Sequence, residues 1–100
     1  MREDIEYAIR HHLKIQFQMT DTPDDKFILF HPYAALLDLF DGLSFIGLVE
    51  KHHTNPTPNY IARPKLDGIK FVEILNEHFE PNHELWKGLK LDTIDILAKA

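Results

Sequence analysis

Between Phe27 and Ile74 the chain consists of short apolar segments separated by turn signals. The dipeptide Asp41-Gly42 lies between the apolar runs 36–40 and 43–49 and is a signal for a tight hairpin. Connections this short join antiparallel neighbours, because parallel strands need a long crossover connection. The spacing therefore predicts a small antiparallel β-barrel or a curved sheet.

The segments around this hairpin complete the expected strands. Ile15–Met19 alternates apolar with polar residues, which is the period of a half-buried strand. The run 26–40 is too long for one straight strand, and we expect a bend or bulge at Pro32, which cannot donate to a sheet ladder. Two further strands are predicted at Tyr60–Arg63 and Ile69–Leu75, with a short turn at 66–68 between them.

Helices are expected at both ends of the chain. Ile5, Ala8 and Ile9 recur at helical spacing, together with His12 and Leu13, and acidic residues occupy the first turn of this segment. The spacing predicts an amphipathic helix that covers one open end of the barrel.

We divide the chain into a helix-plus-barrel domain at 1–80 and a helical extension at 81–100. Asn82 is a candidate N-cap for a short helix that carries Trp86, and a final helix is predicted over 93–99. The predicted fold is mainly β (α+β): a small antiparallel barrel of about five strands, an N-terminal helix and one or two short C-terminal helices.

Composition narrows the class of protein. A chain of 100 residues with 44% apolar residues has the size and composition of one globular domain. It has no cysteine, which excludes disulfides and thiolate metal sites, and no apolar run of membrane-spanning length. The net charge of −5 argues against a dedicated binder of duplex DNA, which usually carries a basic face. We expect a cytoplasmic protein that does not enter the membrane.

The sequence contains no pattern for catalysis or for metal binding. No nucleophile lies next to a candidate base, and no glycine-rich phosphate loop is present. His11 and His12 are adjacent on the expected helix, so their side chains diverge by about 100° and cannot bind one ion together. His52 and His53 lie in a loop without the further ligands that a zinc site needs. We therefore expect neither an enzyme nor a bound metal or cofactor.

Six short motifs occur in the order and spacing of a known family. They are Ala8-Ile9-Arg10, Ile15-Gln16-Phe17, His31-Pro32-Tyr33, Leu43–Gly47, Leu66-Asp67-Gly68-Ile69 and Phe79-Glu80-Pro81. On these motifs the chain resembles the WYL domains over residues 4–86. The resemblance implies an Sm-like, SH3-type β-barrel with an N-terminal helix. Such domains occur mostly in bacterial transcriptional regulators and are thought to sense nucleic acids or nucleotide-like effectors.

The chain departs from the family where ligand-facing residues are expected. The Trp-Tyr-Leu signature falls on residues 43–45, and the Arg-x-Phe motif reads Ala62-Arg63-Pro64. The second arginine of the family falls on Gly68, and a tyrosine falls on Met19. The helix-turn-helix of the family has no counterpart here, so we expect either a fragment of a longer regulator or a stand-alone, divergent domain.

The remaining basic and aromatic residues define a candidate ligand site. The candidate cations are Arg63, Lys65, Lys70, Arg10 and Lys14, and the candidate aromatic residues are Tyr60, Tyr33 and Phe45. A basic strip would hold phosphates, and aromatic faces would stack on unpaired bases. In the alternative interpretation the lysines are solvated and the aromatic residues belong to the core. Arg63 is the strongest single candidate, because a shift of one residue at Pro64 would let it replace the missing arginine.

Two functions of different classes follow. In the first, the domain is a non-enzymatic sensor linked to bacterial transcription regulation, and it binds a nucleotide-like or single-stranded nucleic-acid ligand. In the second, it has lost the ligand site and is a protein-interaction module, either as a homo-oligomer or as an accessory to a DNA-binding partner protein. The retained Arg63 and Lys65 favour the first function. The apolar Met19, Leu43 and Phe45, at positions where polar residues are expected, favour the second.

Overall fold

A computed structural model of the chain describes residues 1–52, 54, 59–82, 84 and 94–100. In chain order the elements are helix α1 (Arg2–Arg10), strands β1 (Leu13–Met19), β2 (Ile28–Asp38), β3 (Gly42–Lys51) and β4 (Tyr60–Ala62), the 3-10 helix η1 (Leu66–Gly68), and strands β5 (Ile69–His78) and β6 (Ile94–Lys99). The predicted mainly β fold with an N-terminal helix is confirmed.

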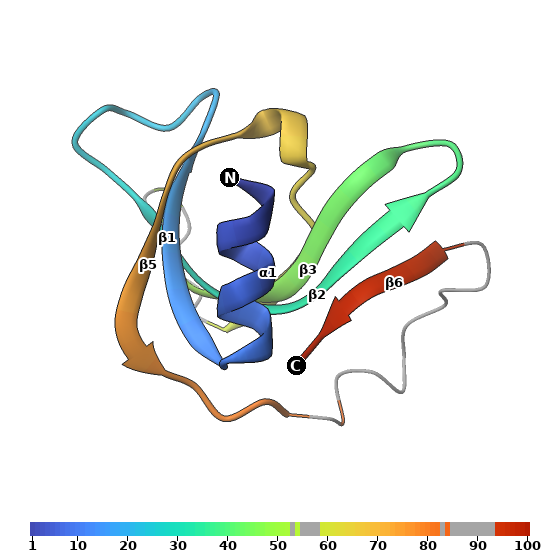
Figure 1. The fold of residues 1–100 in the computed structure, drawn as a ribbon. Coiled ribbons are helices and arrows are strands. Elements are labelled where there is room, and N and C mark those ends of the chain that lie inside the picture. Colours follow the sequence, from blue (N-terminus) through green and yellow to red (C-terminus); the bar gives the residue numbers. More distant parts are fainter. Residues whose placement is uncertain (53, 55–58, 83, 85–93) are drawn as a thin grey trace.

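The strands form one antiparallel sheet with the order β4-β3-β2-β1-β5, and β6 also pairs with β2. β3 follows one edge of β2, whereas β1 and β6 share the other edge. β1 pairs with residues 28–30 of β2, and β6 pairs with residues 34–38. The sheet curves around α1, with β1 and β5 on one side of the helix and β2, β3 and β6 on the other (Figure 1).

A bend in the β2–β3 hairpin allows one edge of β2 to pair with both β1 and β6. The pairing register shifts after Pro32, so that Tyr33 is an extra residue in β2. Pro32 pairs with Gly47 of β3. A Cβ atom on Gly47 would overlap the carbonyl oxygen of His31 and lie 2.6 Å from the ring of Phe30. The two strands therefore approach so closely that only glycine fits, and the predicted bend at Pro32 is confirmed.

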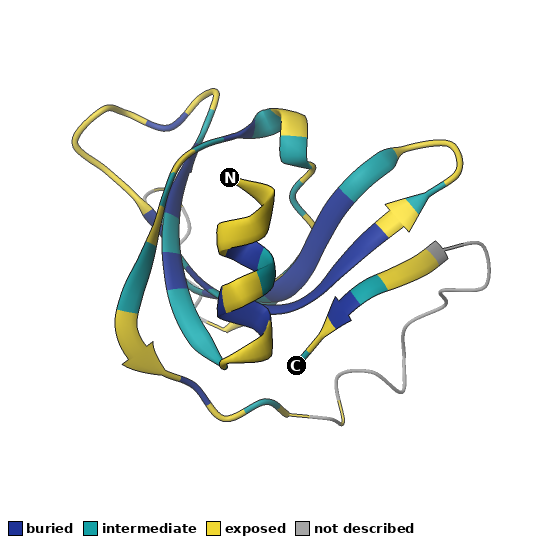
Figure 2. Ribbon diagram, in the orientation of Figure 1, coloured by how far each residue is buried: buried dark blue, intermediate teal, exposed yellow. Residues whose placement is uncertain are grey.

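The core lies between α1 and the face of the sheet that curves around it (Figure 2). The helix buries Ile5, Ala8 and Ile9 and packs against β1, β2, β5 and β6. The sheet contributes the apolar side chains of Ile15, Phe17, Ile28, Phe30, Ala35, Phe45, Val49, Ile69 and Ala98. Most of these positions alternate along their strands, as expected where one face of a strand is buried.

The prediction of a helix over 93–99 is wrong. Residues 94–99 form β6, whose backbone pairs with residues 34–38 of β2. The pairing register of β6 shifts between Ile96 and Ala98, so Leu97 is an extra residue that interrupts the alternation of a regular strand. The short helix expected after Asn82 lies outside the described residues.

The N-terminal helix is shorter than the sequence predicts. α1 ends at Arg10, and Leu13, which was expected on the helix, begins β1. His12 adopts a φ of 55°, a left-handed conformation that redirects the chain from the helix into the strand. The turn predicted at 66–68 is present as η1.

Candidate ligand-binding site

Tyr60 and Arg63, two of the candidate ligand residues, line the same cavity. β4 places Tyr60 opposite Val49 of β3, and Arg63 directly follows β4. The cavity has a volume of about 260 Å³. Its lining residues are Phe17, Met19, Ile28, Val49, His52, Tyr60, Ala62, Arg63 and Pro64.

This cavity, which we call the Tyr60 cavity, combines an apolar wall with a few polar groups. Phe17, Ile28 and Val49 are buried core residues that close it toward the interior. Tyr60, Arg63 and His52 supply its aromatic and polar groups, and none of the described residues that line it is acidic. A concave site with mainly apolar walls and a few orienting polar groups is typical of small-molecule binding.

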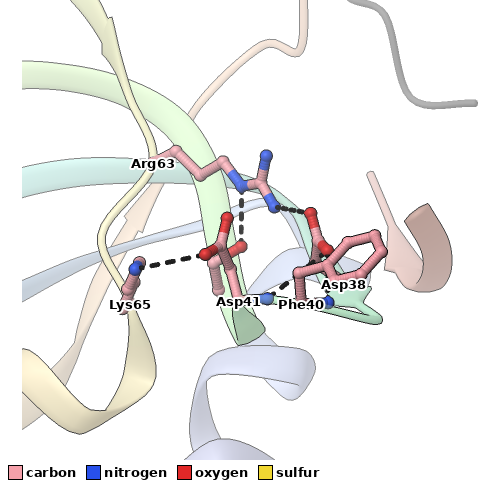
Figure 3. Close-up of polar contacts among 6 residues, drawn as sticks. Asp38, Phe40, Asp41, Arg63 and Lys65 are labelled. Atoms are coloured by element: carbon pink, nitrogen blue, oxygen red, sulfur yellow. Dashed lines mark hydrogen bonds and ion pairs between the residues drawn. The ribbon is translucent and has the colours of Figure 1, made fainter. Parts of the chain in front are cut away.

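Contacts with the β2–β3 hairpin orient the Arg63 side chain (Figure 3). Nε of Arg63 donates a hydrogen bond of 2.8 Å to Oγ of the buried Ser44, and Nη2 lies 3.5 Å from Oδ2 of Asp38. The backbone N–H of Phe40 donates to Oδ1 of Asp38 at 2.8 Å. That bond is the main reason why the pKa of Asp38 is lowered, and Arg63 adds to the effect. These contacts hold the guanidinium of Arg63 against Ser44 of β3 and Asp38 of β2.

Lys65 lies beside the tip of the same hairpin. Its Nζ is 3.7 Å from Oδ1 of Asp41 (Figure 3), and both side chains are 57% exposed. An ion pair this exposed contributes little to stability. An isolated β-bridge joins Lys65 to Ser44, so Lys65 and Arg63 both lie against the start of β3.

The other three candidate cations belong to other elements. Arg10 is in the last turn of α1, Lys14 is in β1 and Lys70 is in β5. Nζ of Lys70 lies 5.7 Å from the centre of the Phe71 ring. The structure therefore brings Arg63 and Lys65 together, and of the five candidate cations only Arg63 lines the Tyr60 cavity.

Lys14 takes part in a separate polar cluster around Glu50. Nζ of Lys14 and Nε2 of His31 lie 2.9 Å and 2.8 Å from Oε1 of Glu50. The hydrogen bond from Lys14, followed by that with His31, lowers the pKa of Glu50, and the bond to Glu50 raises the pKa of Lys14. The His31 ring also stacks on Phe79, with 5.0 Å between ring centres. These contacts connect β1, β2 and β3.

Phe45 and Tyr33 are both buried, and Tyr33 lines a second cavity, of about 470 Å³, together with Lys14. Phe45 is 1% exposed and belongs to the core between α1 and the sheet. Tyr33 is 3% exposed; its ring stacks on Phe79, and its hydroxyl accepts a hydrogen bond of 2.9 Å from the N–H of Asn82. Of the three candidate aromatic residues, Tyr60 is therefore the one that lines the Tyr60 cavity.

His52 lines the cavity although the sequence did not indicate it as a ligand residue. It follows β3, and its Nδ1 accepts a hydrogen bond of 3.1 Å from the N–H of Thr54. Met19 reaches the cavity from the end of β1. Only the pairing of distant strands brings His52 and Met19 to Tyr60, so no local pattern in the sequence predicts their proximity.

Within the described ranges, no group of three or more histidine or acidic side chains is suited to hold a metal ion. No helix in the described part of the chain is both long enough and apolar enough to cross a membrane. Neither a family model, a curated protein nor a solved structure matches the chain.

Proposed function

We propose that the domain is a non-enzymatic regulatory module that binds a nucleotide-like ligand in the Tyr60 cavity. The ligand is a nucleotide or the end of a single-stranded nucleic acid, and the regulatory role is the bacterial transcription control implied by the resemblance to WYL domains. The observation that carries the proposal is that an aromatic residue, Tyr60, and an arginine, Arg63, line one mainly apolar cavity.

The two ends of such a ligand have different requirements. A base needs a flat apolar or aromatic surface, which Tyr60 and the wall of the cavity supply. A phosphate needs charged donors, and a guanidinium has five N–H donors in a planar fork. Within the described residues, Ser44 and Asp38 each take one of these donors. The donors that remain on Arg63 are sufficient for a phosphate oxygen.

The arrangement of the strands supports the Sm-like barrel that forms part of this proposal. The strand order β4-β3-β2-β1-β5 curves around a single core, and the bridge between Ser44 and Lys65 extends the pairing of β3 past the end of β4. A bent antiparallel sheet with a leading helix is compatible with the Sm-like, SH3-type β-barrel that the resemblance implies.

The second candidate function is a protein-interaction or oligomerisation module, and the β2–β3 hairpin favours it. Leu39 and Phe40 at the tip are 85% and 88% exposed. Large apolar side chains exposed side by side often mark an interaction surface.

Titration calorimetry with a panel of nucleotides tests the ligand-binding proposal. We expect binding to weaken at least about tenfold in Tyr60→Ala and in the double variant Arg63→Ala/Lys65→Ala, because each removes a main contact of the ligand. Lys70→Ala is the matched control, since it removes a cation that does not line the cavity, and its affinity should be unchanged. Equal affinities in the wild type and in all variants would contradict the proposal.

A further inference from the structure

Asp38 contacts both the candidate ligand residue Arg63 and the backbone of the β2–β3 hairpin tip, residues 39–41 (Figure 3). Its Oδ2 lies 3.5 Å from Nη2 of Arg63. Its Oδ1 accepts hydrogen bonds from the N–H of Phe40, at 2.8 Å, and of Asp41, at 3.4 Å. One carboxylate therefore connects the hairpin tip to an arginine that lines the Tyr60 cavity.

The contact between the Asp38 carboxylate and Nη2 of Arg63 is the weakest point of this connection. The backbone of Asp38 is held on both sides, because it pairs with Gly42 of β3 and with Ile94 of β6. Nε of Arg63 donates to the buried Ser44 at 2.8 Å. By contrast, the 3.5 Å between Oδ2 and Nη2 exceeds the length of about 2.7–2.9 Å that is usual for a strong charge-assisted bond. This ion pair can therefore break while both backbones stay in place.

A phosphate bound by Arg63 would compete with Asp38. The hydrogen bonds from the tip, that of Phe40 above all, lower the pKa of Asp38 below its ordinary value of 3.8, so the side chain is a carboxylate at neutral pH. A phosphate on the same guanidinium would lie only a few ångströms from this carboxylate. Two negative charges that close repel each other. The phosphate and the Asp38 carboxylate therefore disfavour each other at Arg63.

The hairpin tip depends on the same carboxylate for its order. Contacts at both oxygens fix the rotation of the carboxylate, and the loss of Arg63 from one oxygen frees the other to turn away from the tip. Few other contacts hold the tip in place: Leu39 and Phe40 are 85% and 88% exposed. The ion pair of Asp41 with Lys65 is also exposed, and such pairs contribute little.

We propose that Asp38 couples the Tyr60 cavity to the hairpin tip: a phosphate that binds Arg63 displaces the Asp38 carboxylate and loosens residues 39–41. Because coupling is reciprocal, a contact that immobilises the tip weakens phosphate binding by the same factor. Asp38 keeps Arg63 occupied until the ligand arrives. The identity of the anion, the phosphate of a nucleotide-like ligand, rests on the proposed function, whereas the contacts of Asp38 do not.

An NMR titration of the backbone amides tests the coupling. The probes are adenosine 5′-monophosphate, inorganic phosphate and adenosine, each at constant ionic strength. We expect both phosphates to shift the amide signals of Phe40 and Asp41 and to lower their heteronuclear NOE, because the carboxylate leaves these N–H groups. Adenosine carries no phosphate and should change neither quantity. In Arg63→Ala neither phosphate should affect the tip signals.

Substitution of Asp38 tests the competition for Arg63. Asp38→Asn keeps an oxygen for the N–H groups of the tip but removes the negative charge. Adenosine 5′-monophosphate should therefore bind about fivefold more tightly, whereas the affinity for adenosine should be unchanged. Asp41→Asn is the matched control, because it removes the same charge from the same tip, but Asp41 pairs with Lys65 rather than with Arg63. Equal affinities of Asp38→Asn and the wild type for the monophosphate would overturn the competition.

The titrations also separate this inference from the proposed function. If inorganic phosphate changes the tip signals but adenosine 5′-monophosphate binds no more tightly than phosphate, the base has no site. The proposed function then fails and the coupling stands. If the monophosphate binds through Tyr60 and Arg63 but the tip signals stay unchanged, the coupling fails and the proposed function stands. If neither phosphate changes the tip signals, the coupling is overturned.

Discussion

Nε of Arg63 donates a hydrogen bond of 2.8 Å to Oγ of Ser44, a residue that is 1% exposed. This bond attaches the segment after β4 to the start of β3 and fixes the direction of the guanidinium of Arg63, a residue that lines the Tyr60 cavity. The proposed resemblance to WYL domains aligns Ser44 with the tyrosine of their signature.

Ser44→Ala should lower the free energy of unfolding by about 1 kcal/mol, the usual net contribution of one hydrogen bond. The loss stays moderate because the Arg63 side chain is 33% exposed and water can solvate its Nε. Urea unfolding measures the change. Thr54→Ala is the control and should change the stability little, because the contact of its Oγ1 with Nδ1 of His52, at 3.0 Å, is exposed to solvent. Equal stability of Ser44→Ala and the wild type would show that the bond does not hold Arg63 in solution.

Gly47→Ala should be strongly destabilising, by about 3 kcal/mol or more, because the added methyl group overlaps backbone in a bend that has no space for it. The contact partners are the His31 carbonyl and the Phe30 ring. Gly42→Ala is the comparison: Gly42 has a φ of +78°, but a Cβ atom added there would have no heavy atom within 4 Å. Gly42→Ala should therefore lower the free energy of unfolding by only about 1 kcal/mol, through backbone strain. Thermal unfolding of both variants shows which of them is less stable. If Gly42→Ala were less stable than Gly47→Ala, the close approach of β2 and β3 would be contradicted.

Much of this sheet could be predicted from local sequence patterns. The Asp41-Gly42 signal, the alternation in β1 and the bend at Pro32 all reflect backbone preferences that act within a few residues. β6 could not be predicted in this way. Its strand conformation depends on pairing with β2, more than fifty residues earlier in the chain. Leu97 is an extra residue in β6. Ile94 and Leu97 are three residues apart, which is also the spacing of one face of a helix.

The candidate site was predictable only in part, for a related reason. Tyr60 and Arg63 are close in sequence, so local patterns indicated both. The sequence does not show that Phe45 and Tyr33 are buried. In the folded chain Phe45 packs in the core beneath α1, and Tyr33 stacks on Phe79. The carboxylates that pair with Lys14, Arg63 and Lys65 also come from distant parts of the chain.

Gln18→Glu should destabilise the fold by about 3 kcal/mol. Gln18 is 2% exposed, and its Nε2 donates to the carbonyl oxygens of Pro23, Asp24 and Lys26, which order the β1–β2 connection. A carboxylate at this position would face three acceptors with no donor of its own. Chemical denaturation measures the loss.

Gln16→Glu is the matched control for Gln18→Glu, since Gln16 lies two residues before Gln18 in β1. Its Nε2 lies 2.7 Å from Oε2 of Glu73 in an exposed contact. The new repulsion there should cost less than about 1 kcal/mol, because water screens exposed charges. If Gln18→Glu and Gln16→Glu lost equal stability, the burial of the Gln18 amide would not explain the loss in Gln18→Glu.

Stability should fall in acid partly through Glu50. Lys14 and His31 lower the pKa of Glu50 below its ordinary value of 4.5. A group whose pKa is lower in the folded state stabilises the fold above its unfolded pKa, and this contribution is lost as the pH falls through the folded pKa. Glu50→Gln should therefore lose less stability than the wild type between neutral pH and pH values below 4.5.

Urea unfolding at a series of pH values measures that difference. Glu3→Gln, which removes an exposed carboxylate of the N-terminal helix, controls for the change in net charge. Parallel stability profiles for Glu50→Gln and the wild type would contradict the role of the Lys14–Glu50–His31 cluster.

Binding of a nucleotide-like ligand in the Tyr60 cavity, through Tyr60 and Arg63, can be measured directly. The experiment is fluorescence anisotropy of labelled single-stranded DNA and RNA oligonucleotides, titrated with the wild-type protein at two salt concentrations. We predict saturable binding that weakens as salt rises, because Arg63 contacts a phosphate, and that is lost in Tyr60→Ala. Flat titrations at low salt, for oligonucleotides and for competing mononucleotides alike, would contradict the proposed function.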